Sequence, residues 1–362
     1  MKINEICKYA PKSNIKAGEA TVKGSHMFFT SSSDESKRYC DYQFDGEGVI
    51  MGTGGNATLH YYNGKYSVST DCVVLLPDER VNCKYLYYFF LANMQTLEAG
   101  FKGAGLKHTN KNYIGNIEFG TIPSIEKQQQ TIEIFDKLSK LIHKRKQQLQ
   151  QLDELVKARF VEMFGDPVAN PHGFEKVSLS ELADIRIGPF GSLLHKEDYI
   201  EGGYALLNPS HIIDGKIVPD NKLTISAQKY EELSAYHLEI DDVVMGRRGE
   251  MGRCAVVTDD GYLCGTGSLL IRTKGEVTAD YIQKVISFPS FKKTIEDMAV
   301  GQTMSNLNVP IVSNFQIIKP PIEVQKNYYA FVEQVDKSKV AVQKALDEAQ
   351  LLFDSLMQKY FG

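Results

Sequence analysis

The sequence IEKQ at residues 125–128 recurs as IEVQ at residues 322–325, 197 positions later in the chain. The dipeptide Phe-Gly at residues 164–165 recurs at the same offset, at residues 361–362. Self-similarity at one fixed offset is the sequence signature of a repeated structural unit. The two segments that begin with these tetrapeptides and end with these dipeptides are therefore predicted to be copies of one element.

The repeat extends upstream of both segments, at offsets that vary only between 194 and 198. The aligned pairs are residues 48–52 with 242–246, 66–70 with 262–266, and 103–116 with 301–314. The chain is therefore predicted to have four consecutive parts. These are a first globular domain (1–121), a long helix (122–166), a second globular domain (167–319) and a second long helix (320–362).

The first long helix carries clear signals at both ends. Ser124 is a suitable N-cap residue and Glu126 places a negative charge in the first turn, while Gly165 followed by Pro167 ends the helix. About 40 residues at a rise of 1.5 Å per residue give a rod of roughly 60 Å. This length exceeds that of an ordinary globular helix.

Apolar residues recur every seven positions in both helices, which predicts a left-handed coiled-coil seam. We expect the two copies to pack as an antiparallel pair with a pseudo-twofold axis between the domains. The alternative is that each helix packs on its own domain. The residues expected at the helix-pair interface are Phe135, Leu138, Ile142, Leu149, Leu152, Val156, Val335, Val342, Leu346, Phe353 and Leu356.

The composition is that of an ordinary globular protein, with 362 residues, 43% hydrophobic and 24% charged residues. No stretch is long and apolar enough for a membrane span or a signal core, and the six scattered cysteines form no C-x-x-C pair. We therefore expect a cytoplasmic protein with reduced thiols. The formal net charge of −4 counts against indiscriminate nucleic-acid binding but permits a local basic surface.

The two globular domains are each predicted to have an α+β fold with a mixed or antiparallel sheet. Short β-branched runs separated by Gly and Asn indicate strands at residues 48–51, 67–76, 243–245, 254–257 and 268–272. The best candidates for helices within the domains are residues 85–99 and 279–298.

Polar loops rich in glycine distinguish the two domains, whose strands otherwise agree. In the alignment of the repeats, Thr53 corresponds to Arg247, Gly54 to Arg248 and His108 to Asn306. Lys, Arg, Asn, Gln and Ser side chains are those that hold phosphates or read base edges. A shared scaffold with different loop tips suits two readers of two different short sequences.

Sequence motifs for catalysis are absent. The chain contains no phosphate-binding G-x-x-x-x-G-K-[ST] loop and no G-x-S-x-G nucleophile elbow, and its eight histidines lack metal-ligand spacing. We expect no catalytic and no metal-binding residues, which favours a binding protein over a self-sufficient methyltransferase or nuclease.

The duplicated plan resembles the specificity (S) subunits of type I restriction–modification enzymes, over essentially the whole chain. The motifs that carry the resemblance are IEKQQ at residues 125–129, FVEMFGDP at 160–167, FDGE at 44–47, GTGGN at 52–56 and GPFGS at 188–192. The compact first domain beginning at Met1 departs from the family pattern, and we expect this to alter its termini or its DNA contacts.

The resemblance implies a function and a set of partners. Each globular domain would be a target recognition domain that reads one half of a bipartite duplex DNA sequence, and the helix pair would set the spacer between the halves. Two methyltransferase (M) subunits would bind this scaffold, and a restriction (R) subunit could join them. S-adenosylmethionine, ATP and Mg²⁺ would belong to those partners, with no cofactor in this chain.

We expect DNA contacts from polar loop residues in both domains. They are Lys65, Lys102, Lys107, His108, Asn110 and Lys111 in the first domain and Ser192, Arg247, Arg248, Gln302, Ser305 and Asn306 in the second. The competing interpretation is a coiled-coil interaction scaffold that recruits partners without reading DNA. Sequence-specific DNA binding by the assembled complex distinguishes the two.

Overall fold

The computed structural model describes residues 1–250, 252–299 and 306–362 of the chain. It divides into two compact units, and each unit takes one part of both long helices. Unit 1 comprises Met1–Leu149 and Ala341–Gly362, and unit 2 comprises Gln150–Val340. Each globular domain therefore has its core completed by helix residues from two distant parts of the sequence.

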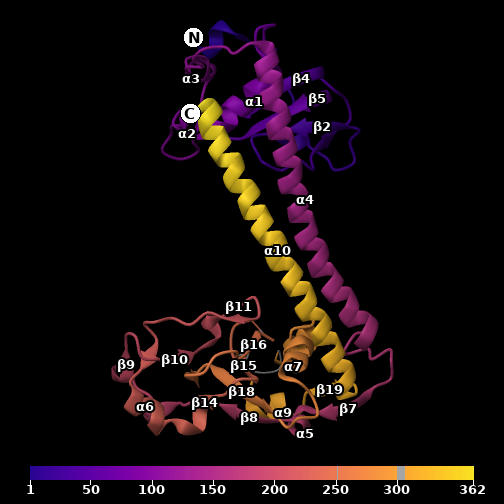
Figure 1. Cartoon of the computed structure of the whole chain (residues 1–362), viewed down its shortest axis with the longest axis vertical. Helices are drawn as coiled ribbons and strands as arrows, with labels where there is room; N and C mark the ends of the chain where they lie inside the picture. The colour runs from indigo at the N-terminus through magenta and orange to yellow at the C-terminus, as the bar shows by residue number, and fades with distance from the viewer. Residues whose placement is uncertain (251, 300–305) are drawn as a thin grey trace. The chain divides into compact units, whose positions relative to one another are not determined.

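Unit 1 is built on a six-stranded sheet with the order β1-β6-β4-β5-β2-β3 (Figure 1). Its neighbours are antiparallel except β2 and β5, which run parallel. The strands are β1 (Cys7–Tyr9), β2 (His26–Phe29), β3 (Arg38–Tyr39), β4 (Phe44–Gly52), β5 (Leu59–Val68) and β6 (Cys72–Pro77). The strand expected at residues 67–76 is thus two strands, because Cys72 N–H bonds back to Ser69 O at 3.1 Å in a turn.

Two glycines face each other in the β4–β5 pair. Gly46 lies opposite Gly64 in the register, and both have positive φ angles, of 130° and 141°. Glycine adopts this backbone region without the steric cost that a Cβ atom would bring. Farther along β4, a Cβ on Gly48 would lie 2.1 Å from the Tyr66 hydroxyl, so glycine lets the Tyr66 ring fold across the strand.

Alternate residues of the central strands face two different cores, as the period of a strand requires. Val49, Met51 and Leu75 contact helix α1 and form the larger core with Phe90 and Phe135. Ile50 and Val74 face the other side, in a smaller core that contains Phe29, Tyr66 and Val68. The helices of this domain are α1 (Cys83–Ala92), α2 (Met94–Glu98) and α3 (Lys111–Gly115). The helix expected at residues 85–99 is interrupted at Asn93, which ends α1.

Unit 2 contains a four-stranded antiparallel sheet of order β16-β15-β18-β8 and a five-stranded sheet of order β14-β17-β10-β13-β9 (Figure 1). Two short pairs, β11-β12 and β19-β7, complete it. The strands are β7 (Glu175–Ser178), β8 (Ala183–Ile187), β9 (Tyr199–Ile200), β10 (Tyr204–Leu207), β11 (Ile212–Ile213), β12 (Lys216–Ile217), β13 (Thr224–Ile225), β14 (His237–Leu238), β15 (Asp242–Gly246), β16 (Cys254–Val256), β17 (Tyr262–Cys264), β18 (Ser268–Thr273) and β19 (Gln316–Lys319).

The helices of unit 2, apart from the short helix that contains Tyr230 and packs on the five-stranded sheet, cover one face of the four-stranded sheet. Val243 and Met245 of β15 pack against this helical layer, whereas Val244 points to the core shared with the five-stranded sheet. The helices are α5 (Leu179–Leu182), α6 (Ala227–Glu232), α7 (Ala279–Ile286), α8 (Pro289–Ala299) and α9 (Val309–Ser313). The helix expected at residues 279–298 is two helices, because Pro289 lacks an N–H to continue the first and begins the second.

The long helices α4 (Ile125–Phe164) and α10 (Ile322–Phe361) each run for 40 residues. Within unit 1, the beginning of α4 packs on the end of α10, where the rings of Phe135 and Phe353 lie 5.3 Å apart. Within unit 2, the end of α4 packs on the beginning of α10, where Tyr328 O–H donates to Val156 O at 3.3 Å. The two helices are therefore antiparallel, and the predicted fold class is confirmed.

Candidate nucleic-acid interface

Two of the polar loops of unit 1 lie side by side at the end of β4. Lys102 and His108 exchange both backbone hydrogen bonds at 3.0 Å, which closes the loop between them into a hairpin. The returning arm of this hairpin pairs with the loop after β4. Gly55 N–H donates to Lys107 O at 2.8 Å, and Thr109 N–H donates to Thr53 O at 3.0 Å.

The side chains of Lys102, Lys107 and His108 are exposed on this hairpin, so three of the predicted DNA contacts lie together. Asn110 lies next to them, and its side-chain oxygen caps α3 by accepting Tyr113 N–H at 2.9 Å. Lys111 follows at the start of α3, with its Nζ 4.9 Å from the centre of the Tyr9 ring. These five residues form one basic, solvent-exposed surface at the end of the sheet.

Lys65 lies elsewhere in unit 1. It is exposed on β5, and its Nζ lies 4.4 Å from the centre of the Tyr42 ring, which in turn contacts the His26 ring at 5.2 Å. Lys65 lies opposite Asp45 in the β4–β5 register, a pairing that no local sequence pattern indicates. Lys65 therefore lies beside an aromatic ring and not among the lysines of the hairpin surface.

A cavity of about 230 Å³ lies beside the hairpin surface, and its lining includes a lysine that was not among the predicted DNA contacts. Lys12 lines it together with Lys111, Thr53 and Thr70. Lys12 lies in an irregular segment after β1, where neither a motif nor a periodic pattern marks it. The nearby Tyr9 O–H donates to Lys111 O at 2.8 Å, a contact between distant segments that no local pattern indicates.

The corresponding loops of unit 2 are held by equivalent backbone hydrogen bonds. Arg247 O accepts Leu307 N–H at 3.0 Å, as Thr53 O accepts Thr109 N–H. Arg247 N–H donates to Gly267 O at 2.9 Å, as Thr53 N–H donates to Asp71 O at 2.7 Å. The two domains therefore present their loop tips on the same backbone frame, with different side chains.

Arg247 and Arg248 have different environments at this tip. Arg247 is half-buried, and its Nε donates to Leu307 O at 3.0 Å. Burial lowers its pKa from the ordinary arginine value, and the neighbouring positive charge of Arg248 lowers it further. Arg248 is exposed. Arg247 thus makes a structural contact within the loop, whereas the Arg248 side chain is exposed to solvent.

The other predicted residues of the second domain are only partly covered by the described structure. Gln302 and Ser305 lie outside the described residues. Ser192 belongs to a short 3₁₀ turn, Gly191–Leu193, that follows β8. Asn306 is half-buried and directly precedes Leu307, which places its backbone against Arg247.

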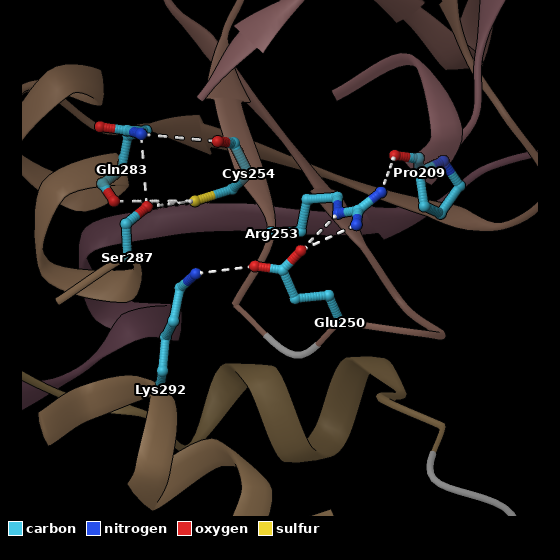
Figure 2. A network of polar contacts seen from close by, with 7 residues as sticks. All are labelled: Pro209, Glu250, Arg253, Cys254, Gln283, Ser287 and Lys292. Atoms are coloured by element: carbon cyan, nitrogen blue, oxygen red, sulfur yellow. Dashed lines mark hydrogen bonds and ion pairs between the residues drawn. The ribbon is translucent and has the colours of Figure 1, made fainter. Parts of the chain in front are cut away.

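An ion-pair network lies at the far end of the loop that carries Arg247 and Arg248 (Figure 2). Glu250 Oε2 contacts Arg253 Nη2 at 2.7 Å, and Glu250 Oε1 contacts Lys292 Nζ of α8 at 3.0 Å. These two cations hold the pKa of Glu250 below its ordinary value, mainly through their hydrogen bonds. No local sequence pattern marks these residues, because Lys292 is distant from Glu250 in the sequence and a single charged residue is typical of a solvent-exposed surface.

The residues expected at the helix-pair interface fall into three places. Phe135, Phe353 and Leu356 belong to the core of unit 1, and Leu152, Val156 and Val335 to the core of unit 2. Ile142, Leu149 and Leu346 pack together between α4 and α10 in unit 1. Leu138 and Val342 are half-buried. The predicted residues therefore serve two structures at once, the helix pair and the cores of the domains.

A model of the type I restriction modification DNA specificity domain matches the sequence twice, at residues 1–153 and 171–349. The chain belongs to this family. The two matches coincide with the two copies of the repeat, each taking one globular domain with helix residues that follow it. The family resemblance predicted from the helix motifs is confirmed.

Relatives and solved structures agree with this family. The chain is 21% identical over 324 residues to the type I restriction enzyme MjaVIII specificity subunit of Methanocaldococcus jannaschii, covering 82% of this chain and 75% of the relative. Its fold is similar to that of the type I restriction-modification S subunit from M. genitalium, with a TM-score of 0.67 at 14% identity, covering 100% of this chain and 95% of that chain. A structure from a study of complex assembly and conformational transition in the type I R-M system gives a TM-score of 0.55 at 16% identity, covering 100% and 96%.

Two further properties follow from the described part of the chain. Across residues 1–250, 252–299 and 306–362, no group of three or more His, Cys, Asp or Glu side chains is arranged to hold a metal ion. In these same ranges, no helix has the length and apolar character needed to cross a membrane.

Proposed function

We propose that this chain reads a bipartite duplex DNA target, with one half-site for each globular domain, and takes no part in the chemistry itself. The observation that carries this proposal is the shared backbone frame of the two tips. The backbone hydrogen bonds of Thr53 and Arg247 are equivalent, yet the side chains at these two positions differ. A shared loop backbone with two different sets of side chains is suited to binding two different DNA half-sites in the same orientation relative to each domain.

The charges on these tips support DNA as the ligand. Lys102, Lys107 and Lys111 gather on the tip of unit 1, and Arg248 extends from that of unit 2. Lysine and arginine contacts to phosphates position a protein on duplex DNA, and arginine also pairs with guanine in the major groove. A chain whose formal charge is −4 binds DNA through such local surfaces and not through its total charge.

The helix pair supports the proposal that the chain organises partners. Helix α4 begins in unit 1 and ends in unit 2, and α10 begins in unit 2 and ends in unit 1, so both helices connect the two domains. Two methyltransferase subunits would bind this scaffold, and a restriction subunit could join them. S-adenosylmethionine, ATP and Mg²⁺ would then be held by those partners, and catalysis would occur there.

DNA binding by the assembled complex tests the proposal. The full chain is combined with its methyltransferase subunit and selected against a random duplex library, and the bound sequences are read. The proposal predicts two short specified blocks separated by a gap of constant length. Enrichment of a single continuous block, or of no sequence at all, would contradict it.

A further inference from the structure

A cavity of about 400 Å³ in unit 2 lies at the far end of the Arg247–Arg248 loop. Its charged lining consists of three cations and two acids, which are Arg253, Lys284, Lys292, Asp214 and Glu250. Figure 2 shows Glu250 between two of the cations, with Gln283 and Ser287 bonded to one another and to Cys254 beside them. The carboxylate of Glu250 therefore occupies the position in which an anion would meet both positive groups.

The two cations are held in place by contacts other than Glu250. Arg253 Nη1 donates to Pro209 O at 3.2 Å. The stem of Lys292 lies on Gly252, where a Cβ atom would come within 2.8 Å of Lys292 Cγ, and the φ angle of +75° there also requires glycine. Each of the two cations therefore has a contact that does not depend on Glu250.

Glu250 is the least constrained member of the network. Its side chain is 52% exposed, against 34% for Arg253 and 32% for Lys292. Exposed ion pairs contribute little stability, so exchanging one anion for another here costs little. A phosphate oxygen binds arginine with the same charge-assisted hydrogen bonds as a carboxylate, and often through two of them.

The network is continuous with the proposed DNA-binding tip. Gly246 N–H donates to Arg253 O at 2.8 Å, so Arg253 lies directly across the strand pair from the residue before Arg247. Pro209, which accepts from Arg253, also lies 3.1 Å from where a Cβ on Gly246 would be. A duplex held by Arg248 would bring its backbone to this end of the same loop.

We propose that Glu250 holds the place of a DNA backbone phosphate, and that DNA displaces it to bind Arg253 and Lys292. This inference rests on the proposed function. It assigns the two cations to sequence-independent contact with the DNA backbone. In the free protein, Glu250 keeps this pair neutralised and lowers affinity for any duplex.

Two substitutions that are expected to change DNA affinity in opposite directions test this assignment. Glu250→Gln should bind both target and scrambled duplexes about three- to tenfold more tightly, because the competing carboxylate is gone. Lys292→Gln should weaken binding to both equally and reduce the slope of log K against log salt by about one, the value for one lost phosphate contact. If the pair only braced the loop, both substitutions would weaken binding.

The matched control is Glu276, which contacts Lys319 at the same distance of 3.0 Å. Glu276 follows Thr273 at the end of β18, whereas the Arg247–Arg248 loop lies beside Ser268 at the start of that strand. Glu276→Gln changes the net charge by the same amount and should leave DNA affinity unchanged. All variants are measured in the full chain with its methyltransferase subunit, by fluorescence anisotropy across a salt series, after thermal unfolding confirms that they fold.

Three results would overturn the inference. They are weaker or unchanged binding by Glu250→Gln, an equal gain in Glu276→Gln, and loss of the Glu250→Gln gain when low millimolar inorganic phosphate is added at constant ionic strength. The last result would identify a site for the free ion. Because scrambled duplex contains no target sequence, the change in its affinity is independent of whether the wild-type complex selects a bipartite target.

Discussion

Gln325 makes in unit 2 the same three backbone hydrogen bonds that Gln128 makes in unit 1. Gln128 accepts Asn82 N–H at 2.8 Å and donates to Arg80 O and Pro123 O, both at 2.9 Å. Gln325 accepts Thr278 N–H at 3.0 Å and donates to Glu276 O at 3.4 Å and Pro320 O at 2.9 Å. Both side chains are fully buried. Each glutamine ties the start of a long helix to the N-cap residue of a domain helix, which explains why the motif recurs.

Substitution of Gln128 by Ala should destabilise unit 1 by about 1–3 kcal/mol, because a buried backbone N–H and two carbonyls lose their partner. Chemical denaturation of the full chain measures the change. Gln129→Ala is the matched control, since Gln129 is exposed and its side chain donates to Glu133 on its own helix at 3.3 Å. A loss of less than about 0.5 kcal/mol in Gln128→Ala, the range of an ordinary surface change, would show that the motif is not structural.

Replacing Lys284 with Met should stabilise the protein at neutral pH, and the gain should shrink as the pH rises towards the ordinary lysine value of 10.5. Burial lowers the pKa of Lys284, and Lys157 and Lys339 lower it further, against the opposing effect of Asp153 and Asp336. The unfolded state therefore binds the proton more tightly, so the wild-type protein gains stability with pH in this range.

Urea denaturation at pH 7.5 and 9.5 measures this difference between Lys284→Met and the wild type. Lys326→Met serves as the control, because Lys326 is 60% exposed and should show the same small effect at both pH values. An advantage of Lys284→Met that does not change with pH would contradict the assigned pKa direction.

Cys40 should be the single thiol that reacts rapidly with a disulfide reagent in the native protein. It is exposed, whereas the other five cysteines are buried. Burial raises the pKa of Cys72 to about 11 and those of Cys7, Cys83, Cys254 and Cys264 to about 12, which removes the reactive thiolate. A colorimetric thiol titration should give one fast equivalent, all six in denaturant, and none that is fast in Cys40→Ser.

Arg248→Ala and Arg247→Ala should differ in their effect on folding. Each should weaken binding to the target by about 1–3 kcal/mol if it pairs with a base. Arg247→Ala should in addition lower the melting temperature, because it removes the Nε contact to Leu307 O. Anisotropy and thermal unfolding separate the two effects. Binding by Arg248→Ala that matches the wild type would remove this residue from the proposed interface.

The duplication and the helix pair were predictable from the sequence because they depend on periodic patterns. The ends of α4 coincide with local signals, since Ser124 Oγ accepts Lys127 N–H and Gly165 has a φ angle of 73°. The alignment of Thr53 with Arg247 anticipated two loops with equivalent backbone bonds. The helix ends are set by local residues, and the loops occur in both copies of the repeat, so the sequence indicates both features.

Other features depend on contacts between distant segments and left no local signal. The place of Lys65 follows from the pairing of β4 with β5, which is visible only in the sheet register. The approach of Lys292 to Glu250 depends on how α8 packs beside the β15–β16 loop. Periodicity shows which residues are buried, but it does not show which exposed charges from separate elements meet.

Genome-wide mapping of adenine methylation by single-molecule sequencing tests the central claim most directly. Cells with the gene, without it, and with the Arg248→Ala variant are compared. The account predicts a two-part motif with a fixed gap that disappears on deletion, and that is relaxed or lost in one half alone with the variant. Methylation that is the same in all three strains would contradict the claim that this chain specifies a DNA sequence.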